Sequence, residues 1–379
     1  MTLTLNDEQG MIREAAKRFL EEKSGASQHR ALRDSDDETG FSSALWHEMV
    51  AMGWPGIAID TPFGGSGFGY VGLGLILEQA GRNLTASPLQ SAILCGATLV
   101  RELGTDAQKA ALLPAIASGD RLLTLALEEG AHHAPRAVAL SVRREGDGYI
   151  LDGRKTFVLD AHVADRFVVI ARSSGSAGET DGMSAFLVDA SSEGVTVERH
   201  SLVDARNVGV LRLDQVRVPA SALLGGEGMA WAGLERVLDI ANIGLAAELL
   251  GICDRAFDIT LGYLKERRQF ERTIGSFQAL QHRAAQLFVE LELARSVVLQ
   301  ALRAIDDGAD DLALHASAAK AKLCEVAERV TNEAIQMHGG IGVTDEHDIG
   351  FYLKRSRAAM QYLGDHNYHL DRFADLRGF

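Results

Sequence analysis

The residue types best suited to chemistry gather in one stretch of the C-terminal third, Arg267–Gln278, which reads RRQFERTIGSFQ. It combines paired arginines with an aromatic residue, Phe270, and a terminal glutamine. The arginine guanidinium donates paired, charge-assisted hydrogen bonds to phosphate and carboxylate groups. The stretch therefore predicts a binding site for an extended anionic ligand. The alternative is a solvated helix end that carries a few charges, and spacing alone does not decide between them.

Two helices are expected to position this stretch, because apolar residues recur on both sides of it at intervals of three and four. The upstream set is Leu245, Leu249, Ile252, Ala256, Ile259 and Tyr263, and the downstream set is Leu280, Ala284, Leu287, Leu291, Ala294, Val298 and Ala301. Each set predicts a helix face packed against other helices. Ile274 and Gly275 break the pattern, so the second helix is expected to open at Phe277 and Gln278.

The composition is typical of a folded protein with two or three domains. The chain has 379 residues, of which 46% are hydrophobic and 24% charged. Its net charge is −14, and no basic tract interrupts that balance. This argues against nucleic acid or an anionic membrane surface as a partner, although a local site can still bind a small anion. No apolar run is long enough to predict a membrane span.

Three cysteines, Cys95, Cys253 and Cys324, are far apart in sequence and form no CxxC pair. An odd number without such a pair predicts neither a disulfide framework nor a zinc site. Reduced, buried thiols and a cytoplasmic location are therefore expected. The N-terminus, MTLTLNDEQG, lacks a basic region followed by an apolar run, so no signal peptide is expected.

The order of elements predicts an α+β chain. Residues 1–122 are expected to be mostly helical, with Asn6 as an N-cap and an irregular glycine-rich loop at Gly53–Gly69. The helices expected there are Phe41–Met52, Tyr70–Gly81, Ser87–Gly104 and Thr105–Ser118. Residues 123–223 are expected to form a β-domain, and residues 224–379 a helical bundle whose last long helix stops at Gly339-Gly340.

The β-domain is predicted from short, alternating, β-branched segments with turns at regular intervals. A hairpin is expected around the turn Glu145–Gly148. The further strands expected are Phe167–Ala171, Ala185–Val188, Val195–Glu198 and Val208–Val218.

At this point the residues resemble the acyl-CoA dehydrogenases. The segments that carry the resemblance are Lys265–Gln286, Gln336–Asp365, Asp147–Val158 and Leu113–Ala131, which follow the family's order over nearly the whole chain. The resemblance implies an N-terminal helical domain, a middle β-barrel or sandwich domain and a C-terminal four-helix bundle.

The resemblance also implies chemistry. In the family, a carboxylate removes the α-proton of an acyl-CoA thioester and a hydride leaves the β-carbon for the N5 atom of FAD. The family is typically tetrameric, acts in lipid metabolism, and places each FAD across a subunit interface. The partners implied are therefore an acyl-CoA substrate and either a second copy of this chain or a homologous subunit.

By resemblance, eight residues match the family's contacts to a neighbouring subunit's FAD, and we call them the donor set. Its members are Arg267, Gln269, Phe270, Phe277 and Gln278, on the pyrophosphate side, and Gln336, Gly339 and Gly340, on the adenine side. Glu271 departs from the family's glycine, and a carboxylate beside a pyrophosphate is unfavourable unless it points away.

The family's contacts to the chain's own flavin fall in two segments, Leu127–Ala134 and Phe157–Asp160, which we call the own-chain pocket. Leu127 and Leu159 stand where the family has flavin-binding hydroxyls, and Glu129 and His133 replace its proline and serine. Leaving a buried polar group of the flavin without a partner costs about 1–3 kcal/mol. The pocket therefore looks eroded.

The family's catalytic glutamate is also missing. Its two known positions fall on Leu363 and on Ala241, the latter beside Asn242. Neither leucine nor alanine can accept a proton, so no catalytic residue is assigned. The nearest carboxylates in sequence are Asp365, Glu248 and Glu235, each of which would have to act from a displaced position.

Two polar clusters remain, His132-His133 and Asp345–Asp348, and both are interpreted as solvated surface, not as metal sites. Four functions stay open. The first is a base-lacking subunit that completes a partner's FAD site, and the second is an active homotetrameric dehydrogenase with a displaced base. The third is another flavin chemistry such as monooxygenation, and the fourth is a non-enzymatic binding protein.

Overall fold

The computed structural model describes residues 4–35 and 37–379, so the first three residues of the N-terminal segment read above lie outside the described residues. The chain forms two compact units. One comprises the described part of Met1–Asp36 with Tyr70–Ala86 and Asn242–Phe379; the other comprises Asp37–Gly69 and Ser87–Ala241. One long helix, α7 (Trp231–Glu266), contributes its first turns to the second unit and the rest to the first.

The first unit opens with α1 (Asp7–Lys23), whose start follows from its sequence. Asn6 accepts from the backbone N–H of Gln9 at 2.8 Å, and the Gln9 side chain accepts from the Asn6 N–H at 3.1 Å. This reciprocal capping box confirms the predicted N-cap. Two more helices of this unit follow, α2 (Ala26–Asp34), which was not predicted, and α4 (Tyr70–Arg82), which was.

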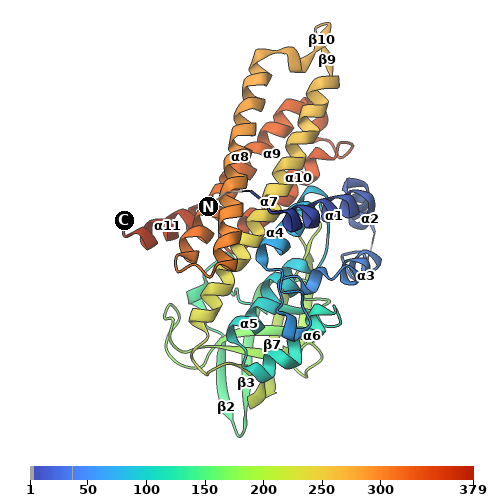
Figure 1. Ribbon diagram of the computed structural model, residues 1–379. Helices are drawn as coiled ribbons and strands as arrows, with labels where there is room; N and C mark the ends of the chain where they lie inside the picture. The colour runs from blue at the N-terminus through green and yellow to red at the C-terminus, as the bar shows by residue number, and fades with distance from the viewer. Residues whose placement is uncertain (1–3, 36) are drawn as a thin grey trace. The chain divides into compact units, whose positions relative to one another are not determined.

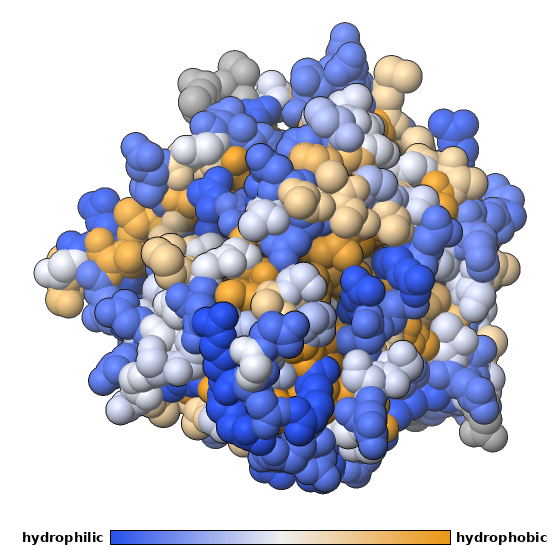
Figure 2. Space-filling model, turned by 90° about the horizontal axis from the view of Figure 1, so that it is seen from below, coloured by the Kyte–Doolittle hydropathy of each residue, from blue (hydrophilic) through white to orange (hydrophobic). Residues whose placement is uncertain are grey.

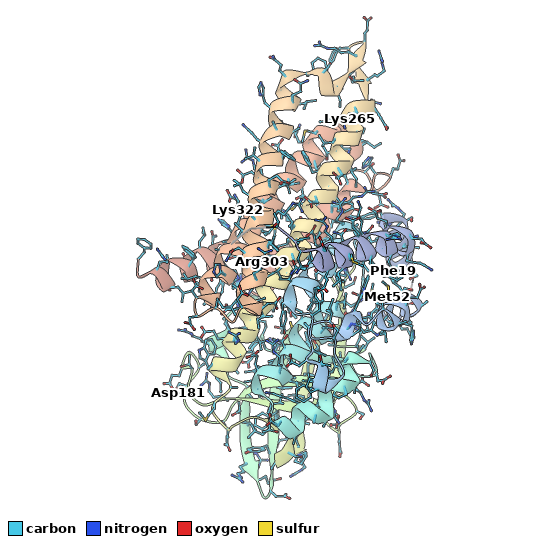
Figure 3. All side chains as sticks on the ribbon, viewed as in Figure 1. Phe19, Met52, Asp181, Lys265, Arg303 and Lys322 are labelled. Carbon is cyan, nitrogen blue, oxygen red and sulfur yellow. The ribbon has the colours of Figure 1, made fainter. Side chains whose placement is uncertain are left out.

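Long helices make up the rest of the first unit (Figure 1). They are α7 from Asn242 onward, α8 (Gln278–Asp306), α9 (Leu312–His338), α10 (Ile349–Gln361) and α11 (His366–Arg377). The predicted apolar faces of α7 and α8 are buried along most of their length and partly exposed where the two helices approach their connection. Lys322, labelled in Figure 3, donates to Glu290 at 2.6 Å and so joins α9 to α8.

The second unit contains the predicted β-domain as one mixed sheet in the order β6-β7-β3-β2-β4-β5-β8, with β1 paired in parallel to β4. Its strands are β1 (Leu123–Ala126), β2 (Ser141–Glu145), β3 (Gly148–Leu159), β4 (Arg166–Arg172), β5 (Met183–Asp189), β6 (Val195–Ser201), β7 (Asn207–Pro219) and β8 (Leu223–Leu224). The expected hairpin is confirmed as β2–β3. Fully buried Phe167, Phe186 and Leu211 lie in its core.

The helices of the second unit are α3 (Ser43–Ala51), a π-helix (Leu89–Ala97), α5 (Thr98–Leu103) and α6 (Asp106–Ala117). The N-cap of α6 is Thr105, whose side chain accepts from the Gln108 N–H. The helix predicted over Ser87–Gly104 is confirmed, with its first half π-helical and its second half α-helical. Short 3₁₀ turns are found at Trp54–Gly56, Thr61–Phe63, Pro135–Ala137, Ala220–Ala222, Ile274–Ser276 and Gly339–Val343, the last two in the first unit.

All three cysteines are buried thiols outside any disulfide, as predicted. None of the helices built from described residues has the length and apolarity needed to cross a bilayer. Hydrophilic residues cover most of the face in Figure 2, with hydrophobic residues in separate patches. The cytoplasmic location stays a prediction.

Candidate functional site

A two-residue β-hairpin connects α7 to α8. Strands β9 (Arg268–Gln269) and β10 (Arg272–Thr273) pair in antiparallel register, just past Lys265 at the end of α7 (Figure 3). The tip residues Phe270 and Glu271 have φ of +52° and +65°, the left-handed values that a tight hairpin turn demands. The sequence predicted a break here but no hairpin, because neither tip residue is glycine or asparagine.

The donor-set residues of this hairpin point outward. Arg267 is exposed, and its guanidinium has no partner among the described residues. Phe270 is 85% exposed and meets the Phe277 ring edge-on at 6.1 Å. The Arg272 guanidinium lies 4.1 Å from the centre of the Phe277 ring. Cations and aromatic faces are therefore available together at the start of α8, as an extended anion with an aromatic part would require.

The adenine-side segment of the donor set is anchored to α7 about one turn before this hairpin, although about seventy residues separate the two in sequence. The link is Tyr263, one turn before the hairpin, which stacks on His338 at 4.4 Å. His338 directly precedes Gly339. A Cβ built on Gly339 or Gly340 would meet no atom within 4 Å, and Gln336 is exposed. The backbone there is open to a ligand.

His338 is a site residue that the sequence analysis missed. Its side chain is buried, and its Nδ1 donates to the Ala334 carbonyl at 2.7 Å. This leaves the buried Nε2 as an acceptor with no partner in the part of the chain that the structure describes. Burial lowers the pKa of His338. A neutral ring with one vacant acceptor beside open glycine backbone fits a ligand that carries N–H or O–H donors, as FAD does.

Replacing Glu271 by glycine is expected to raise the free energy of unfolding by up to about 1 kcal/mol, because glycine adopts a left-handed conformation without the cost that other residues carry. Urea titration of both proteins measures the change. The matched control is Arg272→Gly in strand β10, which should lower stability. An Glu271→Gly protein no more stable than the wild type would contradict the strain read from φ of +65°.

The first segment of the own-chain pocket is fastened to β3 by a buried lysine. Lys155 is fully buried, and its Nζ donates to the Leu127 carbonyl at 3.0 Å and to Glu129 Oε1 at 2.7 Å. Burial lowers the pKa of Lys155 to about 8. Burial also raises the pKa of Glu129, but Lys155 and the N–H groups of Ala139 and Leu140 outweigh it and hold that pKa below its usual range.

Two further contacts of this segment involve Glu128, one inside the segment and one with β3. His133 Nδ1 lies 2.5 Å from Glu128 Oε1, and the Thr156 N–H donates to the Glu128 carbonyl at 2.7 Å. The interpretation of His132-His133 as solvated surface is therefore wrong for His133, whose side chain is only 5% exposed. The sequence signal was the short spacing between Glu128 and His133. Five residues can form a tight loop that brings the two side chains together.

The own-chain pocket lacks the groups that a flavin ring edge requires. Leu127 is 3% exposed, Leu159 is half-buried, and neither carries a donor or an acceptor on its side chain. Phe157 is 44% exposed at φ of +51° and could face a ring. The donor set thus fits FAD, whereas the side chains at the two leucine positions do not.

The positions of the missing base are buried and apolar. Leu363 is 3% and Ala241 1% exposed. The displaced carboxylates already have other partners in the structure. Glu248 accepts from Arg355 at 2.8 Å, and Asp365 caps α11 by accepting from the Tyr368 N–H at 2.9 Å.

Glu235 lies half-buried near the start of α7, in the second unit. The structure therefore provides no carboxylate at either of the two positions where the family has its base.

The turn around Leu363 is held by a buried cation. Lys320 on α9 is fully buried, and its Nζ donates to three carbonyls, those of Met360 at 3.2 Å, Tyr362 at 2.8 Å and Gly364 at 2.6 Å. Burial lowers the pKa of Lys320 to about 8. Leu363 itself has φ of +57°. The lysine therefore fixes the main chain of a turn whose central residue is strained.

This lysine predicts a pH effect. The folded chain releases the Lys320 proton above a pH of about 8, whereas the unfolded chain keeps it up to 10.5. Because the unfolded state then binds more protons, the free energy of unfolding rises with pH across this window, by up to about 3 kcal/mol. Urea titrations of the wild type and of Lys320→Met across the window isolate the effect, since all other groups titrate in both. A constant difference between them would contradict it.

A largely helical unit with one short β-hairpin and a unit built on a mixed sheet are the architecture of the acyl-CoA dehydrogenases, a class of flavoprotein. Three domains of that family match the chain: the acyl-CoA dehydrogenase N-terminal domain over residues 6–120, the middle domain over 127–216 and the C-terminal domain over 223–376. The chain belongs to the acyl-CoA dehydrogenase family, whose cofactor is FAD and whose reaction is the dehydrogenation of acyl-CoA.

Individual relatives agree with this assignment. The chain is 32% identical to the mitochondrial short/branched chain specific acyl-CoA dehydrogenase of Bos taurus, over 98% of this chain and 86% of that protein. It superposes on a variant of the Tcur3481–Tcur3483 steroid ACAD with a TM-score of 0.88 and 34% identity, covering 99% of each chain. It also superposes on the ChsE4–ChsE5 complex of Mycobacterium tuberculosis, with a TM-score of 0.90 and 25% identity, covering 100% of this chain and 99% of that one.

Proposed function

We propose that this chain is a subunit without a catalytic base that completes the FAD site of a homologous partner in an acyl-CoA dehydrogenase complex. One observation carries the proposal. The donor set is open at Gly339 and Gly340, and Arg267 is exposed without a partner among the described residues, whereas the two base positions are the buried apolar residues Leu363 and Ala241. A chain that kept one half of a shared site and lost the other half is suited to serve a neighbour.

In this proposal the donor set binds and orients the cofactor. Arg267 would pair with the pyrophosphate, and the open backbone at Gly339 and Gly340 would admit the adenosine part. The vacant Nε2 of His338 would accept a hydrogen bond from the same ligand. The flavin, when bound, supplies the hydride acceptor, and the proton of the substrate goes to a base on the partner.

Two relatives support a heteromeric assembly and a bulky substrate. The ChsE4–ChsE5 complex and the Tcur3481–Tcur3483 steroid ACAD each carry two protein names, and the second is described as a steroid enzyme. We therefore propose a homologous dehydrogenase subunit as the partner, in a tetramer, and an acyl-CoA with a bulky group such as a sterol side chain as the substrate.

The alternative is an active homotetramer with a displaced base. Asp365 is its best candidate, because it lies two residues from Leu363 and is only partly buried. Its carboxylate would have to leave the N-terminus of α11, which it caps, and losing a cap costs about 1 kcal/mol. Glu248 would have to leave Arg355, which is less favourable because that pair is buried.

The FAD content of the purified chain distinguishes the base-lacking partner subunit from the active homotetramer. Visible absorption gives FAD per polypeptide for the chain alone and for the chain co-expressed with a homologous dehydrogenase. We expect a colourless chain alone and about half an FAD per polypeptide in the complex. In the complex, Arg267→Gln should lower flavin content, whereas Arg357→Gln, at an exposed ion pair with Glu328, should not. A chain that binds one FAD by itself and oxidises acyl-CoA would establish the alternative.

A further inference from the structure

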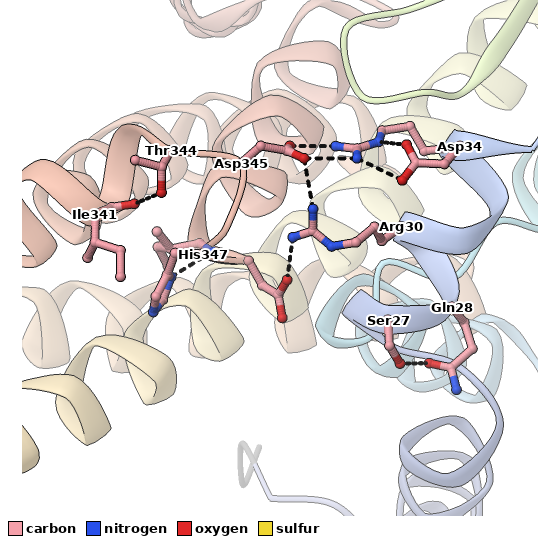
Figure 4. A network of polar contacts seen from close by, with 11 residues as sticks. Ser27, Gln28, Arg30, Asp34, Ile341, Thr344, Asp345 and His347 are labelled. Atoms are coloured by element: carbon pink, nitrogen blue, oxygen red, sulfur yellow. Dashed lines mark hydrogen bonds and ion pairs between the residues drawn. The ribbon is translucent and has the colours of Figure 1, made fainter.

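Helix α2 is joined to the segment that follows the donor-set glycines by a cluster of ion pairs (Figure 4). Arg33 pairs with both oxygens of Asp345, at 2.6 Å and 3.0 Å. Arg30 reaches Asp345 at 2.9 Å and Asp348 at 2.9 Å. Asp345 and Asp348 are solvent-exposed, as interpreted from the sequence, but the ion pairs with α2 were not predicted. The signal in the sequence was the spacing of three between the arginines, which puts both on one face of a helix.

Aromatic contacts strengthen the same junction. The Arg30 and Arg33 guanidiniums lie 4.6 Å and 5.1 Å from the centre of the Phe351 ring on α10. His29 meets that ring edge-on at 5.0 Å. Stacking on the ring restrains the guanidinium of each arginine. Less side-chain conformational entropy is therefore lost when the guanidinium pairs with a carboxylate.

The same end of the segment also contacts the aromatic rings of α7 and α9. His347 lies between the two aspartates in sequence, and its ring is 4.5 Å from His338 and 6.1 Å from Tyr263. Its Nδ1 accepts from the Ile349 N–H at 3.2 Å. Residues 339–348 are thus held both by α2 and by the aromatic rings of α7 and α9.

We infer that Arg30 and Arg33 are positioning residues for the donor set. They touch no donor-set residue in the described structure, but they fix residues 345–348, and through them the backbone at Gly339 and Gly340. The inference rests on the proposed function, because it assigns these arginines a role in binding FAD. It also gives the N-terminal helices a part in the shared site.

The two arginines share the Asp345 carboxylate, so both must be removed to break the junction. A single exposed ion pair contributes little, and salt screens it. Here one carboxylate, Asp345, receives three N–H groups from two arginines, so loss of one arginine leaves the other in place. Arg33, with Asp34 as a second partner, holds the pKa of the Asp345 carboxyl below its usual range. The junction therefore stays charged across the neutral range and is sensitive to ionic strength.

The double variant Arg30→Gln/Arg33→Gln tests the inference, with Arg357→Gln as the matched control. Amide hydrogen exchange of the chain alone measures the local stability of the junction, without flavin or partner. We expect faster exchange at residues 341–351 in the double variant, and in the wild type at high salt, with the core helices unchanged. In the co-expressed complex we expect FAD to bind about tenfold more weakly, as when a supporting contact of a site is removed.

Two results would overturn the inference while leaving the proposed function intact. One is unchanged exchange at residues 341–351 in the double variant. The other is faster exchange with FAD affinity equal to that of the wild type, which would make the junction a purely structural contact. A failure of the proposed function would be seen elsewhere, in a wild-type complex that acquires no flavin, and it would overturn both.

Discussion

Alanine at position 251 is expected to lower the free energy of unfolding by about 3 kcal/mol or more. Gly251 on α7 lies against the backbone of α4. A Cβ at this position would be 1.8 Å from the Glu78 carbonyl oxygen, 2.7 Å from its carbon and 3.0 Å from the Arg82 nitrogen. These are main-chain atoms inside a helix, so they cannot rotate aside, and the two helices would have to separate.

The contact is reciprocal, because a Cβ on Gly81 of α4 would come within 2.1 Å of the Glu248 carbonyl oxygen. Chemical denaturation followed by circular dichroism measures the loss. Gly262→Ala is the matched control, since it lies on the same helix and its Cβ would meet no atom within 4 Å. That variant should gain about 0.5–1 kcal/mol from helix propensity. Equal effects of the two substitutions would contradict the close helix approach.

Removing Arg355 alone should be the second severe change. Its Nε and Nη2 both donate to Glu248 Oε1 at 2.8 Å, and the side chains are only 9% and 5% exposed. Arg355→Met leaves an uncompensated buried carboxylate, which costs about 3–5 kcal/mol. The double variant Glu248→Met/Arg355→Met should recover most of this loss, because a buried pair replaced by apolar side chains is often neutral.

The control for this pair is Arg357→Gln, which removes an exposed ion pair two residues further along the same helix and should cost less than about 1 kcal/mol. A double variant as unstable as Arg355→Met would contradict the reasoning. The outcome also bears on mechanism, because a carboxylate that stabilises the fold through Arg355 is a poor candidate for a mobile base.

The sequence predicted the architecture well because long periodic patterns dominate it. The faces of α7 and α8 were predicted from three-and-four spacing, and the β2–β3 hairpin from its turn and alternation. The hairpin at Phe270 and Glu271 was missed, since its tip residues contradict the usual turn chemistry. Tertiary contacts overrode local preference there.

The site was predictable only in part. The donor-set residues were assigned by resemblance and their role stays a prediction, but the stacking of Tyr263 on His338 brings their two segments together. That contact, and the junction between Arg33 and Asp345, join positions far apart in the chain. The hydrophobic periodicity of a sequence carries no information about such long-range contacts, so only the folded structure reveals them.

The hydrogen bonds from Lys320 to the turn around residue 363 have an evolutionary consequence. All three of its hydrogen bonds end on main-chain oxygens, so the turn is held without regard to which side chain occupies its centre. A mutation that exchanged a carboxylate for leucine at this position would leave the scaffold standing. Such a fold can lose a catalytic side chain at this turn by neutral drift once a duplicated neighbour supplies the same chemistry.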